Sequence, residues 1–384
     1  MKYMRKLASI QLISNILPIE GSDFIEQIQV IGWNLVSKKG EFSINDKCIY
    51  IEIDSIVKDC PKFEFLRKYK FRVKTQKIRG IISQGLAIPL KTFDIPENTP
   101  IDTDVTELLG ITKYLSPSEK AEQDEIERRI KNDKNKLKKF MMRYSWFRRL
   151  FLSRKQKVGF PYWVTKTDEE RIQNIPHVLE QFKDKEVYVT EKIDYQSVTF
   201  TGKLIPNTTP IIGKFLPKKY KFIVCSRNLV NNNKNSLYWK IAQKYNIEQI
   251  LRENPTLTIQ GEQGDTKVQG NKYDIKEPTM WVFNIIDHEK NYHYNYYEMK
   301  SFCNKYNLNI VPLVRIPEYE LLANYTSLKT IGSTVQELVE FSKGKSIINP
   351  KIEREGIVIR CIENGKKLLS FKVINPDFLL KYEQ

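Results

Sequence analysis

The first 110 residues alternate apolar and polar positions in short runs that turn residues separate. Alternation with a period of two is typical of strands that bury one face. The runs lie at residues 8–13, 28–36, 48–53, 72–75 and 85–90, with a turn expected at 38–42. About five short strands at this spacing predict a small Greek-key barrel.

From Phe160 onward the pattern changes to β-rich runs alternating with helical ones. Strands are expected at residues 187–190, 198–201, 222–224, 256–259, 281–286, 357–360 and 368–373. Helices are expected at residues 168–183, 295–306 and 334–343. Since several strands follow one another without an intervening helix, we expect an α+β domain of antiparallel sheets with flanking helices.

Between these parts lies a charged stretch in which Ser116 and Glu119 predict a helix start. Residues 119–139 are expected to form an exposed helix. Residues 131–157 hold 11 basic residues and one acidic residue, a net charge of +10, interleaved with aromatic residues. Such a segment can bind a phosphate backbone, lie on a membrane surface, or be a connector that buries its aromatic rings between domains. We therefore divide the chain into a barrel (1–112), a basic helical connector (113–159) and an α+β domain (160–384).

Composition narrows the possible partners. The chain has 63 Lys and Arg against 46 Asp and Glu, a net charge of +17, which favours polyanions and nucleic acid first. Its five cysteines are far apart and form no Cys-x-x-Cys, so neither a zinc site nor a disulfide framework is predicted. No secretory signal and no apolar run of membrane-spanning length is present, so an intracellular and cytoplasmic protein is expected, with no membrane and no evident obligate protein partner.

One hairpin of the barrel suggests an RNA contact. Residues 77–86 read Lys-Ile-Arg-Gly-Ile-Ile-Ser-Gln-Gly-Leu, which resembles the Lys-x-Arg-Gly-x-x-Ser-x-Gly pattern of tRNA-binding OB domains. The OB-fold is a Greek-key barrel that binds oligonucleotides. Lys77 and Arg79 are thus RNA-binding candidates, as are Arg148 and Arg149 of the connector; the alternative for the hairpin is a pair of solvated charges.

Six segments of the C-terminal half follow one another in a fixed order. They are Glu191-Lys192-Ile193-Asp194, residues 225–229, residues 260–264 with 268–273, residues 281–285, residues 354–360 and residues 370–374. In this order they resemble the nucleotidyltransferase motifs of ATP-dependent RNA ligases, best the subgroup with an N-terminal OB domain. The resemblance covers nearly the whole chain. It implies an ATP-grasp-like nucleotidyltransferase domain after the OB-fold β-barrel and the connector.

The resemblance also implies roles for charged residues. Lys192 would attack the α-phosphate of ATP and form lysyl-AMP. A lysine attacks only when neutral, and since its reference pKa is about 10.4, nearby cations and desolvation must lower it. Lys372 would offset charge on the α-phosphate in the transition state. Glu355 and Glu262 would hold Mg²⁺ or Mn²⁺, directly or through water.

The remaining nucleotide contacts are implied at five positions, with Glu262 able to contact the ribose instead of a metal. The set is Glu191, Asp194, Arg227, Glu262 and Phe283. Arg227 offers a planar fork for ribose hydroxyls or an RNA 5′-phosphate. Phe283 offers a face for adenine, a role that Trp281 could take instead.

Two positions depart from the family pattern. Tyr195 stands where the family usually has glycine, so it could reshape the ribose pocket, slow the first step or point outward. Ser370 replaces a second lysine that relatives often carry, which leaves Lys372 alone in that role. The expected activity is ATP-dependent joining of RNA 3′-hydroxyl and 5′-phosphate ends, at nicks in duplex or tRNA-like RNA. The alternative is an RNA- or tRNA-binding protein whose ligase domain has decayed.

Overall fold

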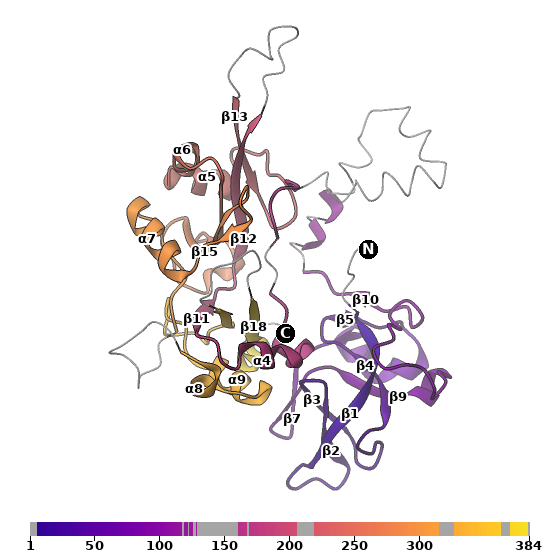
Figure 1. Cartoon of the computed structure of the whole chain (residues 1–384). Helices are drawn as coiled ribbons and strands as arrows, with labels where there is room; N and C mark the ends of the chain where they lie inside the picture. Colours follow the sequence, from indigo (N-terminus) through magenta and orange to yellow (C-terminus); the bar gives the residue numbers. More distant parts are fainter. Residues whose placement is uncertain are drawn as a thin grey trace.

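The computed structural model describes residues 6–116, 119–121, 123–125, 128, 160–166, 169–205, 219–314, 326–361 and 369–382. Figure 1 shows two bodies, an N-terminal one of strands at the lower right and a larger C-terminal one of sheets and helices. Most of the predicted connector, with Arg148 and Arg149, lies outside the described residues. Among those that are described, no helix is long and apolar enough to cross a membrane.

The N-terminal body is built on a five-stranded antiparallel sheet in the order β3-β2-β1-β4-β9. Its strands are β1 (Ala8–Pro18), β2 (Ile25–Val30), β3 (Trp33–Lys38), β4 (Lys47–Ile51) and β9 (Leu86–Pro89). A second sheet joins β10 (Thr112–Lys113), β5 (Ser55–Ile56) and β6 (Arg72–Val73), and β7 (Gln76–Ile78) with β8 (Ile81–Ser83) forms a hairpin. Two 3₁₀ helices, η1 (Pro61–Tyr69) and η2 (Leu90–Phe93), complete this body.

The five-stranded sheet curves until its edges approach each other. The Gln84 N–H, just before β9, donates to the Asn34 carbonyl of β3 at 2.9 Å. On one face of the sheet, apolar residues of all five strands pack together, and on the other face Ile10 and Ile49 pack with η1 and η2. The predicted barrel therefore forms.

One expectation for this body was wrong in detail. Residues 28–36 are not a single strand but a hairpin, in which β2 and β3 meet at Ile31 and Gly32. Ile31 adopts φ +56°, and a side chain at Gly32 would lie 2.8 Å from the Gln173 backbone. The alternation continues through the turn, because Val30 and Trp33 pair across it and both are buried, so the pattern alone hid the break.

The C-terminal body contains two antiparallel sheets. The smaller has the order β11-β17-β18, from Val187–Lys192, Gly356–Cys361 and Ser370–Ile374. The larger has the order β13-β12-β14-β15-β16, from Lys219–Cys225, Gln196–Ile205, Leu257–Gly264, Thr279–Asp287 and Tyr292–His293. The predicted α+β architecture is confirmed.

Helices cover the outer face of each sheet. α5 (Leu237–Lys244), α6 (Ile247–Glu253) and α7 (Tyr296–Tyr306) pack on the larger sheet through a shared apolar core (Figure 1). α4 (Leu179–Phe182), α8 (Leu328–Ile331) and α9 (Val335–Ser342) pack on the smaller one. α7 and α9 begin with capping boxes at Asn295 and Thr334, the residues at which the sequence predicted these helices to start.

The helix expected at residues 168–183 is instead three short pieces, η3 (Ile172–Asn174), η4 (Pro176–Val178) and α4. Pro176 cannot donate a backbone hydrogen bond, and the residue before a proline is biased away from the helical region. The φ and ψ of Ile175, at −131° and 47°, accordingly leave the helix.

The two bodies share a hydrophobic core. Side chains from one face of the N-terminal sheet, such as Trp33 and Tyr50, pack with Ile374 and with Phe378 and Leu379 of α10 (Pro376–Tyr382). The indole N–H of Trp33 donates to Asn174 at 2.8 Å. The N-terminal body is thus held against η3 and β18.

Candidate active site

A cavity of about 1030 Å³ opens between the two sheets of the C-terminal body. All eight residues predicted for catalysis and nucleotide binding line it: Glu191, Lys192, Asp194, Arg227, Glu262, Phe283, Glu355 and Lys372. They come from six separate stretches of chain. The sequence pattern therefore converges on one place, which the order of motifs along the chain could not show.

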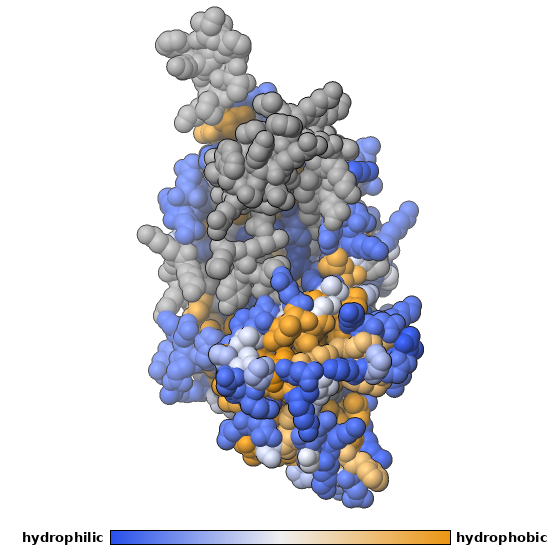
Figure 2. Space-filling model, turned by 90° about the vertical axis from the view of Figure 1, so that its right-hand side faces the viewer, coloured by the Kyte–Doolittle hydropathy of each residue, from blue (hydrophilic) through white to orange (hydrophobic). Residues whose placement is uncertain are grey.

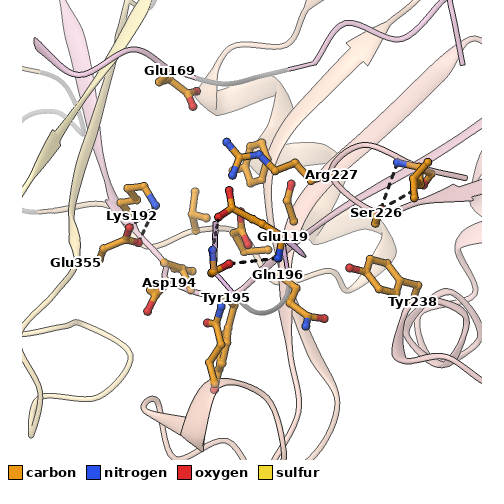
Figure 3. A pocket seen from close by; sticks show the side chains of 18 of the residues that line it. Glu119, Glu169, Lys192, Asp194, Tyr195, Gln196, Ser226, Arg227, Tyr238 and Glu355 are labelled. Carbon is orange, nitrogen blue, oxygen red and sulfur yellow. Dashed lines mark hydrogen bonds and ion pairs between the residues drawn. The ribbon is translucent and has the colours of Figure 1, made fainter. Parts of the chain in front are cut away.

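Lys192 ends β11 on the floor of this cavity, and its ammonium is held by Glu355 (Figure 3). The Nζ atom lies 2.6 Å and 2.7 Å from the two oxygens of that carboxylate. Burial alone would lower the pKa of Lys192, but the negative charges of Glu355, Glu262 and Asp194 outweigh it and raise the pKa. In the free protein Lys192 is therefore protonated.

Glu355 is held in place by its neighbour. Gly356 pairs with Lys192 across β11 and β17, and a side chain there would lie 2.2 Å from the Val373 carbonyl. Its φ of +155° also favours glycine. Lys372 lies on the adjoining strand β18, where it pairs with Val358. Strands β11, β17 and β18 thus present two lysines and one glutamate together.

Glu262 approaches from the other sheet, on β14 opposite Ser197. Burial raises the pKa of Glu262 well above its ordinary value, despite the opposing charge of Lys192. Its Oε2 atom is buried, with no hydrogen-bond partner among the described residues. A buried oxygen of this kind needs a donor or a cation. Together with Glu355 it offers the carboxylate oxygens that Mg²⁺ and Mn²⁺ prefer, so the residues present fit such an ion.

Glu191 and Asp194 are both tied to the loops around the cavity. Glu191 is buried, and its Oε2 accepts the backbone N–H of Ile347 at 2.7 Å. The Asp194 carboxylate pairs with Lys272, and its backbone N–H donates to the Tyr273 hydroxyl at 2.8 Å. The hydrogen bonds and the ion pair of Glu191 and Asp194 therefore fix the loops around Lys192.

The two aromatic candidates separate clearly. Phe283 lines the cavity, whereas Trp281 packs with Tyr195 at 6.1 Å between ring centroids. The Arg360 guanidinium lies 5.8 Å from the centroid of the Phe283 ring and donates to the Phe283 carbonyl at 2.5 Å. Of these two side chains, Phe283 is therefore the one on which a planar ligand ring inside the cavity could stack.

Tyr195 does not obstruct the site. Its φ is outside the left-handed region, and its ring points away from Lys192 and Arg227 in Figure 3. The ring is 7% exposed, packs between Tyr273 and Trp281, and donates a hydrogen bond to Asn271 at 3.1 Å. Gly264 makes room for it, since a side chain there would lie 2.4 Å from the Tyr195 ring.

The remaining RNA-binding candidates lie elsewhere. Lys77 and Arg79 sit in the β7–β8 hairpin, where Arg79 donates to the Gly21 carbonyl at 3.1 Å. Figure 2, which faces the N-terminal body, shows hydrophilic residues interspersed with hydrophobic ones over that surface. Among the described residues no group of three or more His, Cys, Asp or Glu forms a ready metal cluster.

Sequence reasoning missed two buried charges and one acid at the cavity. Arg360 is 2% exposed and donates to Glu169 at 2.5 Å, and Glu169 borders the cavity. An arginine within the apolar run 357–360 was a signal, because a buried charge requires a partner. Glu119 also borders the cavity, and its carboxylate accepts the Ser116 N–H at 3.0 Å and pairs with Lys113 (Figure 3).

Comparison with known proteins identifies two domains. Residues 7–90 match a family model described as an OB-fold domain, and residues 185–374 match the model described as RNA ligase. This chain carries an RNA ligase domain. The ligase has its OB-fold domain at the N-terminal end, which confirms the predicted fold class.

Solved structures of Naegleria gruberi RNA ligase are similar to this ligase along its length. A mutant with AMP and Mn has 26% identity, a TM-score of 0.74 and coverage of 99% of each chain. A mutant with ATP and Mn has 26% identity, a TM-score of 0.74 and coverage of 98% of this chain and 99% of that one. The enzyme with PPi has 27% identity, the same TM-score and 99% coverage of each. No curated protein sequence matches the ligase.

Proposed function

We propose that this chain is an ATP-dependent RNA ligase that joins a 3′-hydroxyl to a 5′-phosphate, at nicks in duplex or tRNA-like RNA. The observation that carries the proposal is the pair of Lys192 and Glu355 inside a cavity that also gathers the six other predicted residues. The likeness to a ligase crystallised with ATP, AMP and Mn supports ATP and a divalent ion.

In the first step Nζ of Lys192 attacks the α-phosphorus of ATP. A P–N bond forms, and the bond from that phosphorus to the oxygen bridging the α- and β-phosphates breaks, so pyrophosphate leaves with the electron pair. Because Lys192 is protonated in the free protein, it must first lose a proton. Glu355 accepts both hydrogen bonds from Nζ, and burial raises its own pKa, which makes it a better proton acceptor.

The surrounding residues bind and orient the nucleotide. Phe283 would stack on adenine, and Lys372 would offset the charge that grows on the α-phosphate. Arg227, an exposed residue that lines the cavity (Figure 3), would bind ribose hydroxyls or the RNA 5′-phosphate. Glu262 and Glu355 would hold Mg²⁺ or Mn²⁺, which supplies positive charge beside the phosphates.

Two further transfers complete the reaction. AMP passes from Lys192 to the RNA 5′-phosphate, which leaves a 5′-5′ pyrophosphate linkage and the free lysine. The RNA 3′-hydroxyl then attacks the original 5′-phosphorus, a phosphodiester forms, and AMP leaves. The OB-fold domain and the segment 113–159 would bind the RNA around this junction.

The test is incubation of the full chain with α-labelled ATP and Mg²⁺ or Mn²⁺, followed by denaturing electrophoresis. The expected result is a labelled protein band that Lys192→Ala abolishes. The exposed α7 variant Lys300→Ala is the matched control and keeps the label. EDTA should prevent labelling. A folded wild-type protein that takes up no label with either ion would contradict the proposal.

A further inference from the structure

The inner face of the larger sheet carries a second cluster of side chains beyond the cavity. The segment 160–166 lies on this face, held by three hydrogen bonds from or to the sheet and the adjoining loop. They are Trp163 Nε1 to Thr201 Oγ1 at 3.2 Å, Gln260 Nε2 to the Thr165 carbonyl at 3.0 Å, and Lys166 Nζ to Asn228 Oδ1 at 2.7 Å. The segment is therefore a fixed part of the sheet's surface.

Two aromatic rings of this segment meet a lysine of β12. The rings of Tyr162 and Trp163 lie edge to face with their centroids 5.0 Å apart. Lys203 Nζ lies 5.2 Å from the Tyr162 centroid and 5.0 Å from the Trp163 centroid, and it donates to the Tyr162 hydroxyl at 3.3 Å. Tyr162 is nevertheless 70% exposed. A large, positioned and exposed aromatic ring beside a cation is suited to stacking on a nucleobase.

Positive charge accumulates on the same face. Lys203 pairs directly with Lys221 across β12 and β13. Lys219 lies two positions before Lys221 on β13, so its side chain is on the same face. Like charges directly opposite each other destabilise a sheet. None of the ion pairs formed within the described ranges involves these three lysines. A phosphate backbone would relieve this repulsion.

This cluster lies on the same side of the sheet as the active site. Glu262 pairs with Ser197, and positions 199, 201 and 203 of β12 continue along that face because side chains alternate. The helices α5, α6 and α7 occupy the opposite face, as Figure 1 shows. The strand rises about 3.4 Å per residue, so Lys203 lies about 20 Å along the sheet from the level of Glu262.

We propose that Tyr162, Lys203, Lys219 and Lys221 form a second RNA-binding site, the β12–β13 platform, which holds the substrate strand away from the reacting ends. The lysines contact phosphates, and the Tyr162 ring stacks on an unpaired or terminal base. A-form RNA rises somewhat less per base pair than the roughly 3.4 Å of B-form DNA, so the contact falls at least about six base pairs from the junction. The inference rests on the proposed RNA ligase function.

The test measures binding of fluorescein-labelled nicked duplex RNA to the full chain by anisotropy over a series of salt concentrations. Tyr162→Ala is expected to weaken binding about fivefold or more when the duplex arm ends about six base pairs from the nick in a single-stranded extension, because an unpaired base then reaches the ring. Lys203→Ala and Lys221→Ala should each reduce the slope of log K against log salt by about 1. Lys221→Ala leaves the contacts of both rings with Lys203 intact, so it tests charge without disturbing the rings.

The matched controls lie on α7, on the opposite face of the sheet. Tyr297 is 44% exposed, and Lys300 is exposed as well. Tyr297→Ala and Lys300→Ala should leave both Kd and salt slope unchanged. Duplex arms shortened from about twelve to about four base pairs should abolish the difference between wild type and the platform variants, because the strand then ends before the platform.

Labelling of Lys192 by ATP is measured on every variant, which separates this inference from the proposed chemistry. Labelling at the wild-type rate with weakened RNA binding in the platform variants alone supports the platform. Wild-type RNA binding by Tyr162→Ala and Lys221→Ala overturns it, and so does an equal loss in the α7 controls. If the wild type takes up no AMP yet RNA binding still depends on Tyr162 and Lys221, the chemistry fails and the platform stands.

Discussion

Replacing Tyr195 by the glycine that the family usually carries should damage the protein rather than improve it. The ring is 7% exposed and packs against Tyr273 and Trp281, with centroids 5.0 Å and 6.1 Å away. Truncation of a large buried aromatic costs about 3–5 kcal/mol. Tyr195→Gly also removes the hydroxyl that donates to Asn271. We expect a loss of about 4 kcal/mol in the free energy of unfolding.

A double-mutant cycle with Gly264 makes this reasoning quantitative. A side chain at Gly264 would lie 2.4 Å from the Tyr195 ring, and the two next-nearest atoms also belong to that ring. Gly264→Ala alone should therefore cost about 1–3 kcal/mol through overpacking. In the Tyr195→Gly background the clash is gone, and the same change should be neutral or stabilise by up to about 1 kcal/mol. The coupling energy is then about 1–4 kcal/mol.

The assay is urea unfolding of the four proteins, together with ATP labelling of Lys192. Gly270→Ala is the control for backbone effects, because it has φ +68° and no neighbour within 4 Å of an added side chain, and its cost should not depend on residue 195. Additive effects of Tyr195→Gly and Gly264→Ala would refute the packing argument. Faster labelling by Tyr195→Gly would show that the tyrosine hinders the site.

Three further outcomes follow from other contacts. Labelling should rise with pH as Lys192 loses its proton, and Glu355→Gln should move that rise to lower pH while slowing the reaction, since the carboxylate raises the pKa of Lys192; a pH–rate profile checks this. Arg360→Met should cost about 3–5 kcal/mol in urea unfolding at pH 7 by leaving Glu169 buried and unpaired. Although burial opposes it, the charge of Arg360 lowers the pKa of Glu169 overall, so the stability that the pair provides is present above the ordinary value of 4.5 and fades as pH falls through the lowered pKa; the deficit should shrink in acid. Trp33→Phe should cost about 1–3 kcal/mol and slow labelling, because the segment that its indole N–H anchors pairs with β18.

The chemistry of the cavity was predictable because its residues keep recognisable neighbours along the chain. Lys192 and Asp194 sit two positions apart, and Glu355 is followed by the glycine that its strand pairing requires. The order of these segments along the chain can be read directly from the sequence. Alternation and turn residues also located most of the strands that carry these segments, but the convergence of the segments in one cavity became visible only in the structure.

Long-range pairing was not predictable in the same way. The residues around Arg360 in the sequence do not indicate that Glu169 is its partner. The two residues lie far apart along the chain, and only the packing of η3 near β17 and β18 brings them together. α5 and α6 were missed because their runs are short, and their apolar faces are defined only by the sheet that they cover. The hairpin at Ile31 and Gly32 was hidden because alternation continued through it.

The shared core of the two bodies has a consequence for synthesis of the chain. The ribosome completes the N-terminal strands long before it makes α10, whose Phe378 and Leu379 pack on one apolar face of their sheet. Until then that apolar face has no cover, a state that favours aggregation or chaperone binding during translation. An isolated OB-fold fragment would keep that exposed face permanently. Expression of the N-terminal domain alone should therefore give an aggregation-prone fragment unless α10 is included.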